Sequence, residues 1–72
     1  MNKELFKALR HDKGLTQKAY GERLGITGNT VSKIERGEAR ITDRIRIAVA
    51  QQFPITHDFL ETYEAAEKLK SF

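Results

Sequence analysis

The sequence contains no cysteine and no tryptophan, and it has only one proline in 72 residues. Without cysteine, the chain forms no disulfide framework and offers no thiolate as a nucleophile or metal ligand. No apolar run approaches the length that spans a bilayer, and the charged start MNKELFKALR lacks the apolar core of a signal peptide. We therefore expect a cytoplasmic protein that does not associate with membranes.

Histidine is also scarce. The two histidines, His11 and His57, lie far apart and have no carboxylate or cysteine partners at the spacing of metal ligands. No Ser-His-Asp or Cys-His arrangement can be assembled, no glycine-rich phosphate loop follows a strand, and a bundle of this size lacks a deep pocket. The expectation is a protein that is not an enzyme and that takes no metal, cofactor or small-molecule ligand.

The length of 72 residues predicts a single domain, 1–72, close to the size at which one hydrophobic core becomes marginal. The net charge of +3 is unevenly distributed along the chain. Residues 1–53 hold eleven Lys and Arg against six acidic residues, whereas 54–72 hold two against four. A basic body with an acidic C-terminal segment fits a surface that meets phosphates, although scattered basic residues often only solvate helices.

The spacing of apolar residues predicts an all-α fold without strands. Threonine stands at four expected helix starts, and glycine or proline follows the expected ends. Ile55 and Leu60 are expected in the core. The expected helices span about 3–12, 17–24, 28–36, 43–52 and a last helix capped by Thr56, within the C-terminal segment 56–72.

The segment 16–37, TQKAYGERLGITGNTVSKIERG, predicts two short helices joined by a tight turn. A side chain larger than methyl at Gly21 would hold the two helices apart, and a β-carbon at Gly25 would strain a left-handed turn. Such a helix-turn-helix most often places its second helix in the major groove of DNA. The alternative is a helical hairpin that only closes a small bundle.

The run FKALRHDKGLTQKAYGERLGITGNTVSKIERGEA resembles the DNA-binding domain of the phage Cro/repressor (XRE) family, and the similarity continues to about Leu60. It covers about five-sixths of the chain. The resemblance implies a compact five-helix, lambda-repressor-like bundle that binds a double-stranded DNA operator as a dimer in the bacterial host. It also implies a structural pair between Arg10 and Glu35, whose alternative is two solvated side chains.

The resemblance places base-reading side chains in the first turns of the third helix. Asn29 is suited to adenine, Lys33 to guanine, and Thr30 to a thymine methyl or a phosphate. Gly28 departs from the family pattern because it offers no side chain at a reading position. The alternative for Asn29 and Thr30 is that they are ordinary first-turn residues.

Phosphate contacts are expected around the same unit, where they fix the register of the protein on DNA. Gln17 matches the family position whose side-chain amide meets the DNA backbone, and basic residues flank it. Glu38 is a second departure, because its charge repels phosphate. The expected phosphate contacts are Gln17, Lys18, Arg36, Arg40 and Arg44.

The two departures favour an alternative in which the chain binds another protein, as do small phage modulators of repression that resemble antirepressors. The partner is then the opposing phage repressor, in a hetero-complex rather than a homodimer. The expected interface is an exposed aromatic face on the last helix, formed by Phe59, Tyr63 and Phe72. The alternative is that Phe59 and Tyr63 complete the core.

Overall fold

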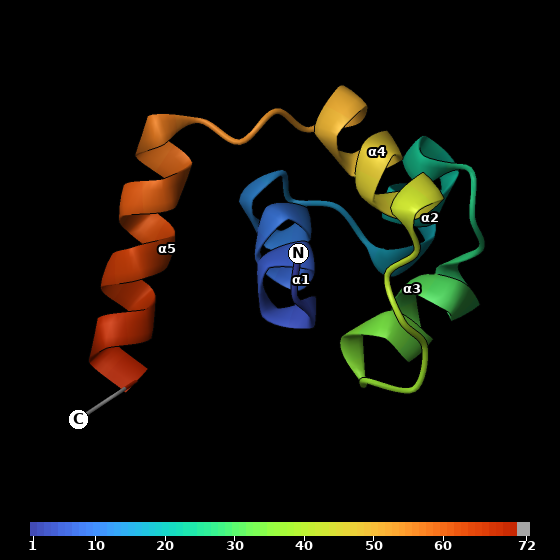
Figure 1. The fold of residues 1–72 in the computed structure, drawn as a ribbon, viewed down its shortest axis with the longest axis horizontal. Helices are drawn as coiled ribbons and strands as arrows, with labels where there is room; N and C mark the ends of the chain where they lie inside the picture. Colours follow the sequence, from blue (N-terminus) through green and yellow to red (C-terminus); the bar gives the residue numbers. More distant parts are fainter. Residues whose placement is uncertain (71–72) are drawn as a thin grey trace.

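The computed structural model describes residues 1–70, which form five helices and no strand. The expected all-α architecture is confirmed (Figure 1). Phe72 lies outside the described residues. Within the described part, no helix is both long enough and apolar enough to cross a membrane. The helices are α1 (Lys3–Asp12), α2 (Gln17–Leu24), α3 (Gly28–Glu35), α4 (Asp43–Gln52) and α5 (His57–Lys70).

Each helix start is fixed by a short polar side chain. Thr16, Thr27 and Thr42 accept hydrogen bonds from the backbone N–H three residues later. Thr56 does the same for the N–H of Phe59, at 3.1 Å. These bonds satisfy N–H groups that have no partner inside the helix, and each such cap stabilises a helix by about 1 kcal/mol. The sequence therefore sets the helix starts locally.

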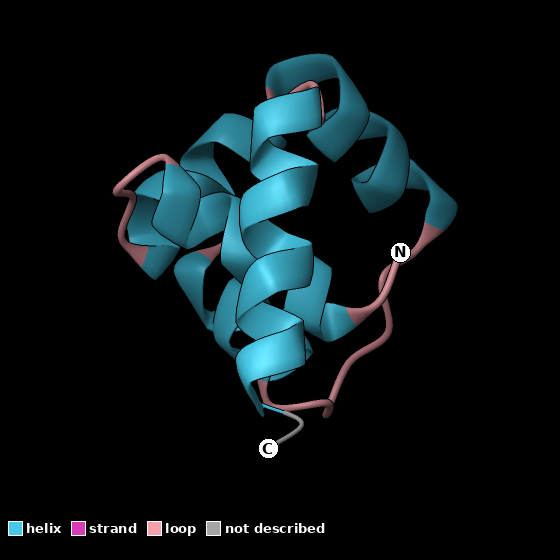
Figure 2. Ribbon diagram, turned by 90° about the vertical axis from the view of Figure 1, so that its left-hand side faces the viewer, coloured by secondary structure: helices cyan, strands magenta, loops and turns pink. Residues whose placement is uncertain are grey.

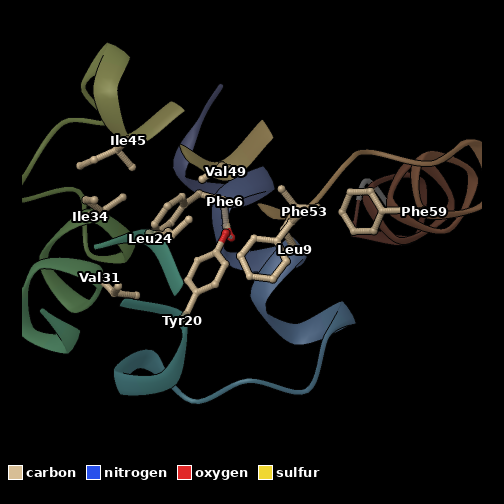
Figure 3. Packing of buried hydrophobic residues seen from close by; sticks show 10 residues of the cluster. All are labelled: Phe6, Leu9, Tyr20, Leu24, Val31, Ile34, Ile45, Val49, Phe53 and Phe59. Atoms are coloured by element: carbon tan, nitrogen blue, oxygen red, sulfur yellow. Dashed lines mark hydrogen bonds between the residues drawn. The ribbon is translucent and has the colours of Figure 1, made fainter. Parts of the chain in front are cut away.

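The core is one cluster of buried apolar side chains drawn from all five helices and the segment after α4 (Figure 3). Tyr20 lies at its centre, fully buried, with its ring 4.9 Å from that of Phe6 and 5.3 Å from that of Phe53. Its hydroxyl donates to the Phe6 backbone carbonyl at 2.9 Å, so the buried phenol is paired. The buried members are Phe6, Leu9, Tyr20, Leu24, Val31, Ile34, Ile45, Val49, Phe53 and Phe59.

Helix α5 lies beside α1, apart from the other three helices, and is joined to α4 by an extended segment (Figures 1 and 2). A groove of about 590 Å³ runs between α1 and α5. Phe59 attaches α5 to the rest of the core and is only 7% exposed. The ring of Tyr63 stacks on that of Phe59, with centroids 6.1 Å apart, and is half-buried.

The expected positions of two apolar residues and of Phe59 are wrong. Leu60 is 38% exposed and Ile55 is 41% exposed, so neither fills the core, and Phe59 takes the position expected for Leu60. Both choices satisfy helical spacing. The helix turns the face of Phe59 and Tyr63 towards α1, because two aromatic rings bury more apolar surface there than Leu60 can. The proposed aromatic interface is therefore largely internal.

The turn between α2 and α3 requires the absence of two β-carbons. Gly25 has a left-handed φ of 75°, and its N–H donates to the Gly21 carbonyl. A β-carbon at residue 21 would lie 2.6 Å from the Ile26 carbonyl oxygen and 2.9 Å from the Thr27 carbonyl carbon. Both are backbone atoms, so the limit at Gly21 is stricter than expected. Even a methyl group does not fit.

We predict that Gly21→Ala destabilises the protein by about 1–3 kcal/mol, because the backbone entering α3 must move. The sign is diagnostic, since alanine in a helix interior ordinarily stabilises by up to about 1 kcal/mol relative to glycine. Glu22→Ala, at the next and exposed position of α2, is the matched control and should change little. Thermal melting measures both. A higher melting temperature for Gly21→Ala would contradict the close contact.

We predict that Phe59→Ala lowers the free energy of unfolding by about 3–5 kcal/mol, because it removes a buried aromatic ring. Leu60→Ala, one residue further along α5, should cost about 0.5 kcal/mol or less because that side chain faces solvent. Chemical denaturation followed by circular dichroism compares the two variants. Equal losses would place both residues on the buried face and contradict the orientation of α5.

Candidate DNA-binding surface

Helix α3 has one buried and one exposed face. Val31 and Ile34 are buried in the core. Asn29, Lys33 and Arg36 are exposed, and their spacing of four and three residues places them along one stripe. The core thus holds one side of α3 rigidly while the opposite side presents an amide and two cations to solvent.

The first turn of α3 is shaped by its cap. Thr27 Oγ1 accepts from the Thr30 N–H at 3.1 Å and lies 3.0 Å from Thr30 Oγ1. Thr30 is half-buried, so its hydroxyl belongs to the cap as well as to the outer surface. The adjacent Asn29 forms no such contact and is exposed. Of the expected base-reading residues, Asn29 and Lys33 are therefore the most available.

Gly28 has a packing role that the sequence analysis missed. A β-carbon at this position would lie 2.9 Å from Lys18 Cα and 3.1 Å from the Lys18 backbone nitrogen. The first turns of α2 and α3 therefore approach so closely that no side chain fits between them. The two helices can cross at this distance only because residue 28 has no side chain. For the same reason, Gly28 can contact DNA only through its backbone.

Arg10 and Glu35 form a two-point ion pair that joins α1 to the end of α3. Arg10 Nε donates to Glu35 Oε2 at 2.7 Å, and Arg10 Nη2 donates to Oε1 at 2.9 Å. Arg10 Nη1 also donates to the Leu15 carbonyl at 3.0 Å. The two side chains are 12% and 5% exposed. This two-point ion pair fixes the orientation of α3 relative to α1. Because both side chains are engaged in it and are largely buried, neither is available to DNA.

The hydrogen-bond partners of Glu35 keep its carboxyl group ionised. Burial raises the pKa of its carboxyl, but hydrogen bonds from Arg10 and Gln17 and the charge of Arg10 outweigh burial and leave the pKa below its ordinary value. A carboxylate with a lowered pKa in the folded state stabilises the fold above its unfolded pKa. That stabilisation is lost as the pH falls through the pKa of the folded state.

Gln17 faces inward as well as outward. Its Nε2 donates to Glu35 Oε1 at 3.3 Å, and the residue is half-buried. One of its two amide N–H groups is thus engaged with the ion pair, which leaves the other for a phosphate. Gln17 therefore links the start of α2 to the end of α3, in addition to the DNA contact expected from the sequence.

The expected phosphate-contacting cations differ in their surroundings. Lys18, Arg40 and Arg44 are exposed. Arg36 instead donates through Nε to Glu38 and through Nη1 to Ser32 Oγ, the latter at 2.6 Å. The sequence analysis missed the role of Ser32, whose only signal is its spacing of four residues from Arg36 on the same helix.

No group of three or more histidine, cysteine or acidic residues suited to a metal ion occurs among residues 1–70. Apart from the Glu38 carboxylate, the surface described above consists of an amide, hydroxyls, cations and backbone N–H groups. These groups donate hydrogen bonds to phosphate oxygens and to base edges in the major groove.

The family comparison agrees with this geometry. A model of the helix-turn-helix family matches residues 6–60, which include α1 from Phe6 onward, all of α2 to α4 and the start of α5. Neither the comparison with curated proteins nor that with solved structures gives a match.

We predict that Glu35→Gln lowers the stability at pH 7 by about 1.5–3 kcal/mol, because Arg10 loses a charge-assisted partner. The difference from the unchanged protein should shrink as the pH falls below about 4.5, the ordinary value for a glutamate, because the unfolded chain then binds a proton at Glu35. It should disappear below the lowered pKa of the folded state, where the carboxyl of the folded protein is protonated too. Melting temperatures of both proteins between pH 7 and pH 3 measure this convergence. A difference that is independent of pH would contradict the role of the Glu35 charge.

Proposed function

The chain belongs to the helix-turn-helix family, and on this basis we propose that it is a sequence-specific transcription regulator of a phage-type genetic switch rather than an enzyme. It acts on DNA in the bacterial cytoplasm, at the nucleoid. One observation carries the proposal: α3 is fixed to the core through Val31 and Ile34 and presents Asn29 and Lys33 on its opposite, exposed side.

The chemistry of this exposed side suits base recognition. The Asn29 amide can pair with adenine through one donor and one acceptor, and the Lys33 ammonium can donate to guanine O6 or N7. Lys18, Arg40 and Arg44 supply exposed positive charge for contacts with phosphates. We call the exposed side of α3 that carries Asn29 and Lys33 the reading surface. It is small, because Gly28 contributes no side chain and the Thr30 hydroxyl lies against Thr27. We infer moderate sequence discrimination, spread over few base pairs per subunit.

The alternative function, binding of an opposing phage repressor through α5, has less support. Its expected interface required Phe59 to be exposed, whereas Phe59 is buried against the core. Tyr63 is half-buried beside it. The aromatic face of α5 is thus used within the chain itself, and the DNA-binding proposal is preferred.

Selection of bound duplexes from a random library tests the function directly, since every possible operator sequence is present in the library. An enriched sequence supports the proposal. Two enriched half-sites about one helical turn apart indicate a homodimer, and a single half-site indicates one subunit. Recovery without enrichment, or no recovery at all, contradicts sequence-specific binding.

We predict that Asn29→Ala and Lys33→Ala each weaken binding to the selected duplex by about 1–3 kcal/mol and relax the preference over a scrambled duplex. Arg40→Ala should instead weaken both duplexes alike and reduce the slope of log K against log salt by about one. Titrations on both duplexes at several salt concentrations separate these effects. Equal losses on both duplexes for Asn29→Ala would exclude it as a base reader.

A further inference from the structure

The end of α3 holds Glu38 in a fixed position. The chain leaves the helix through Gly37, whose φ is 78°, and the Gly37 N–H donates to the Ile34 carbonyl at 3.0 Å. The Glu38 N–H then donates to the Lys33 carbonyl at 2.8 Å. This pair of bonds is the usual closure of a helix by a left-handed glycine. The backbone of Glu38 is therefore set by α3 itself and returns towards the last turn of the helix.

The Glu38 side chain contacts Arg36 there. Arg36 Nε donates to Glu38 Oε2, and Arg36 Nη1 donates to Ser32 Oγ at 2.6 Å. The two charged side chains are 54% and 57% exposed, so the contact lies on the open surface. Arg36 shares its exposed stripe with Asn29 and Lys33, the two most available base-reading residues. The pair thus lies at one end of the candidate reading surface.

The segment that contains this pair is mainly basic. From residue 28 to residue 42, the chain has two carboxylates, Glu35 and Glu38. Glu35 is engaged by Arg10 and Gln17 behind the helix. Glu38 is therefore the one carboxylate of this segment on the outer surface, and its contact neutralises one of the three cations in the segment, Lys33, Arg36 and Arg40.

We propose that Glu38 is an internal competitor of DNA phosphate: its carboxylate occupies the Arg36 guanidinium and so sets the DNA affinity of the chain below what its cations would otherwise give. This inference rests on the proposed DNA-binding function. A carboxylate and a phosphate present the same kind of anionic oxygen to the fork of a guanidinium. Because the pair is exposed, a phosphate can displace Glu38, but only against the energy of the ion pair and the repulsion of the released carboxylate.

The test is DNA affinity of Glu38→Gln, which keeps the size of the side chain and removes its charge. We expect Glu38→Gln to bind the selected duplex about two- to fivefold more tightly, the range of an exposed ion pair. The slope of log K against log salt should become steeper by about 0.9, the value for one more neutralised phosphate. Because phosphate contacts are blind to sequence, a scrambled duplex should gain by a similar factor.

Two further variants assign the effect to Arg36. In an Arg36→Ala background, Glu38→Gln should no longer increase affinity by this factor, because the competed cation is gone. Glu64→Gln removes the same charge from α5 and should leave affinity unchanged at about 0.15 M salt, where charges are screened over about 8 Å. Circular dichroism melts check that the four variants, Glu38→Gln, Arg36→Ala, their combination and Glu64→Gln, are folded like the unchanged chain.

The outcomes are distinct. A gain for Glu38→Gln that depends on Arg36 supports the proposal. Unchanged binding, or the same gain without Arg36 or for Glu64→Gln, overturns it while leaving the DNA-binding function intact. If neither the unchanged chain nor any variant binds duplex DNA, the proposed function fails, and this inference fails with it.

Discussion

The closeness of Gly21 to the backbone of Ile26 and Thr27 is the constraint on which the rest of the structure depends. Because α2 has no side chain at that point, the chain turns directly across it and enters α3 at one defined angle. Val31 and Ile34 then reach the core, and the opposite stripe of α3 necessarily faces outward. Gly28 imposes a second limit of the same kind, against the backbone of Lys18. The absence of side chains at Gly21 and Gly28 thus fixes which side of α3 faces solvent.

Electrostatic interactions at Glu35, on the inner side of α3, also fix this orientation. Arg10 crosses from α1 to Glu35, and Gln17 joins them from the start of α2. Three helices therefore meet at one carboxylate, which is nearly buried and fully engaged. The Arg10–Glu35 ion pair mainly fixes how the three helices are oriented. Its net effect on stability is smaller than the attraction alone, because the desolvation of two charges offsets much of that attraction. The exposed ion pair of Arg36 with Glu38, at the other side of the same helix end, has the opposite character: it is open to competition by other anions.

Much of the fold could be predicted from the sequence because its signals are local. The threonine caps fixed four helix starts, and the apolar spacing indicated the inward positions of α1 to α4. The orientation of α5 could not be predicted in this way, because Phe59 and Leu60 are adjacent and both continue a helical pattern. Only the packing against α1 distinguishes them. The contacts of Gly28 with Lys18 and of Arg36 with Ser32 depend equally on distances that no spacing rule contains.

The attachment of α5 has a consequence for the order in which the molecule opens. Helices α1 to α4 share a common core, whereas α5 leans on α1 beside a groove and enters the core through Phe59 (Figure 3). An element held by so few buried contacts opens at a lower free energy than the whole domain. Backbone amides of α5 should therefore exchange with solvent deuterium while those of α2 and α3 remain protected. The 72-residue chain then unfolds in two cooperative units, α5 first and α1 to α4 second. Helix α3 belongs to the second unit, which needs the higher free energy to open.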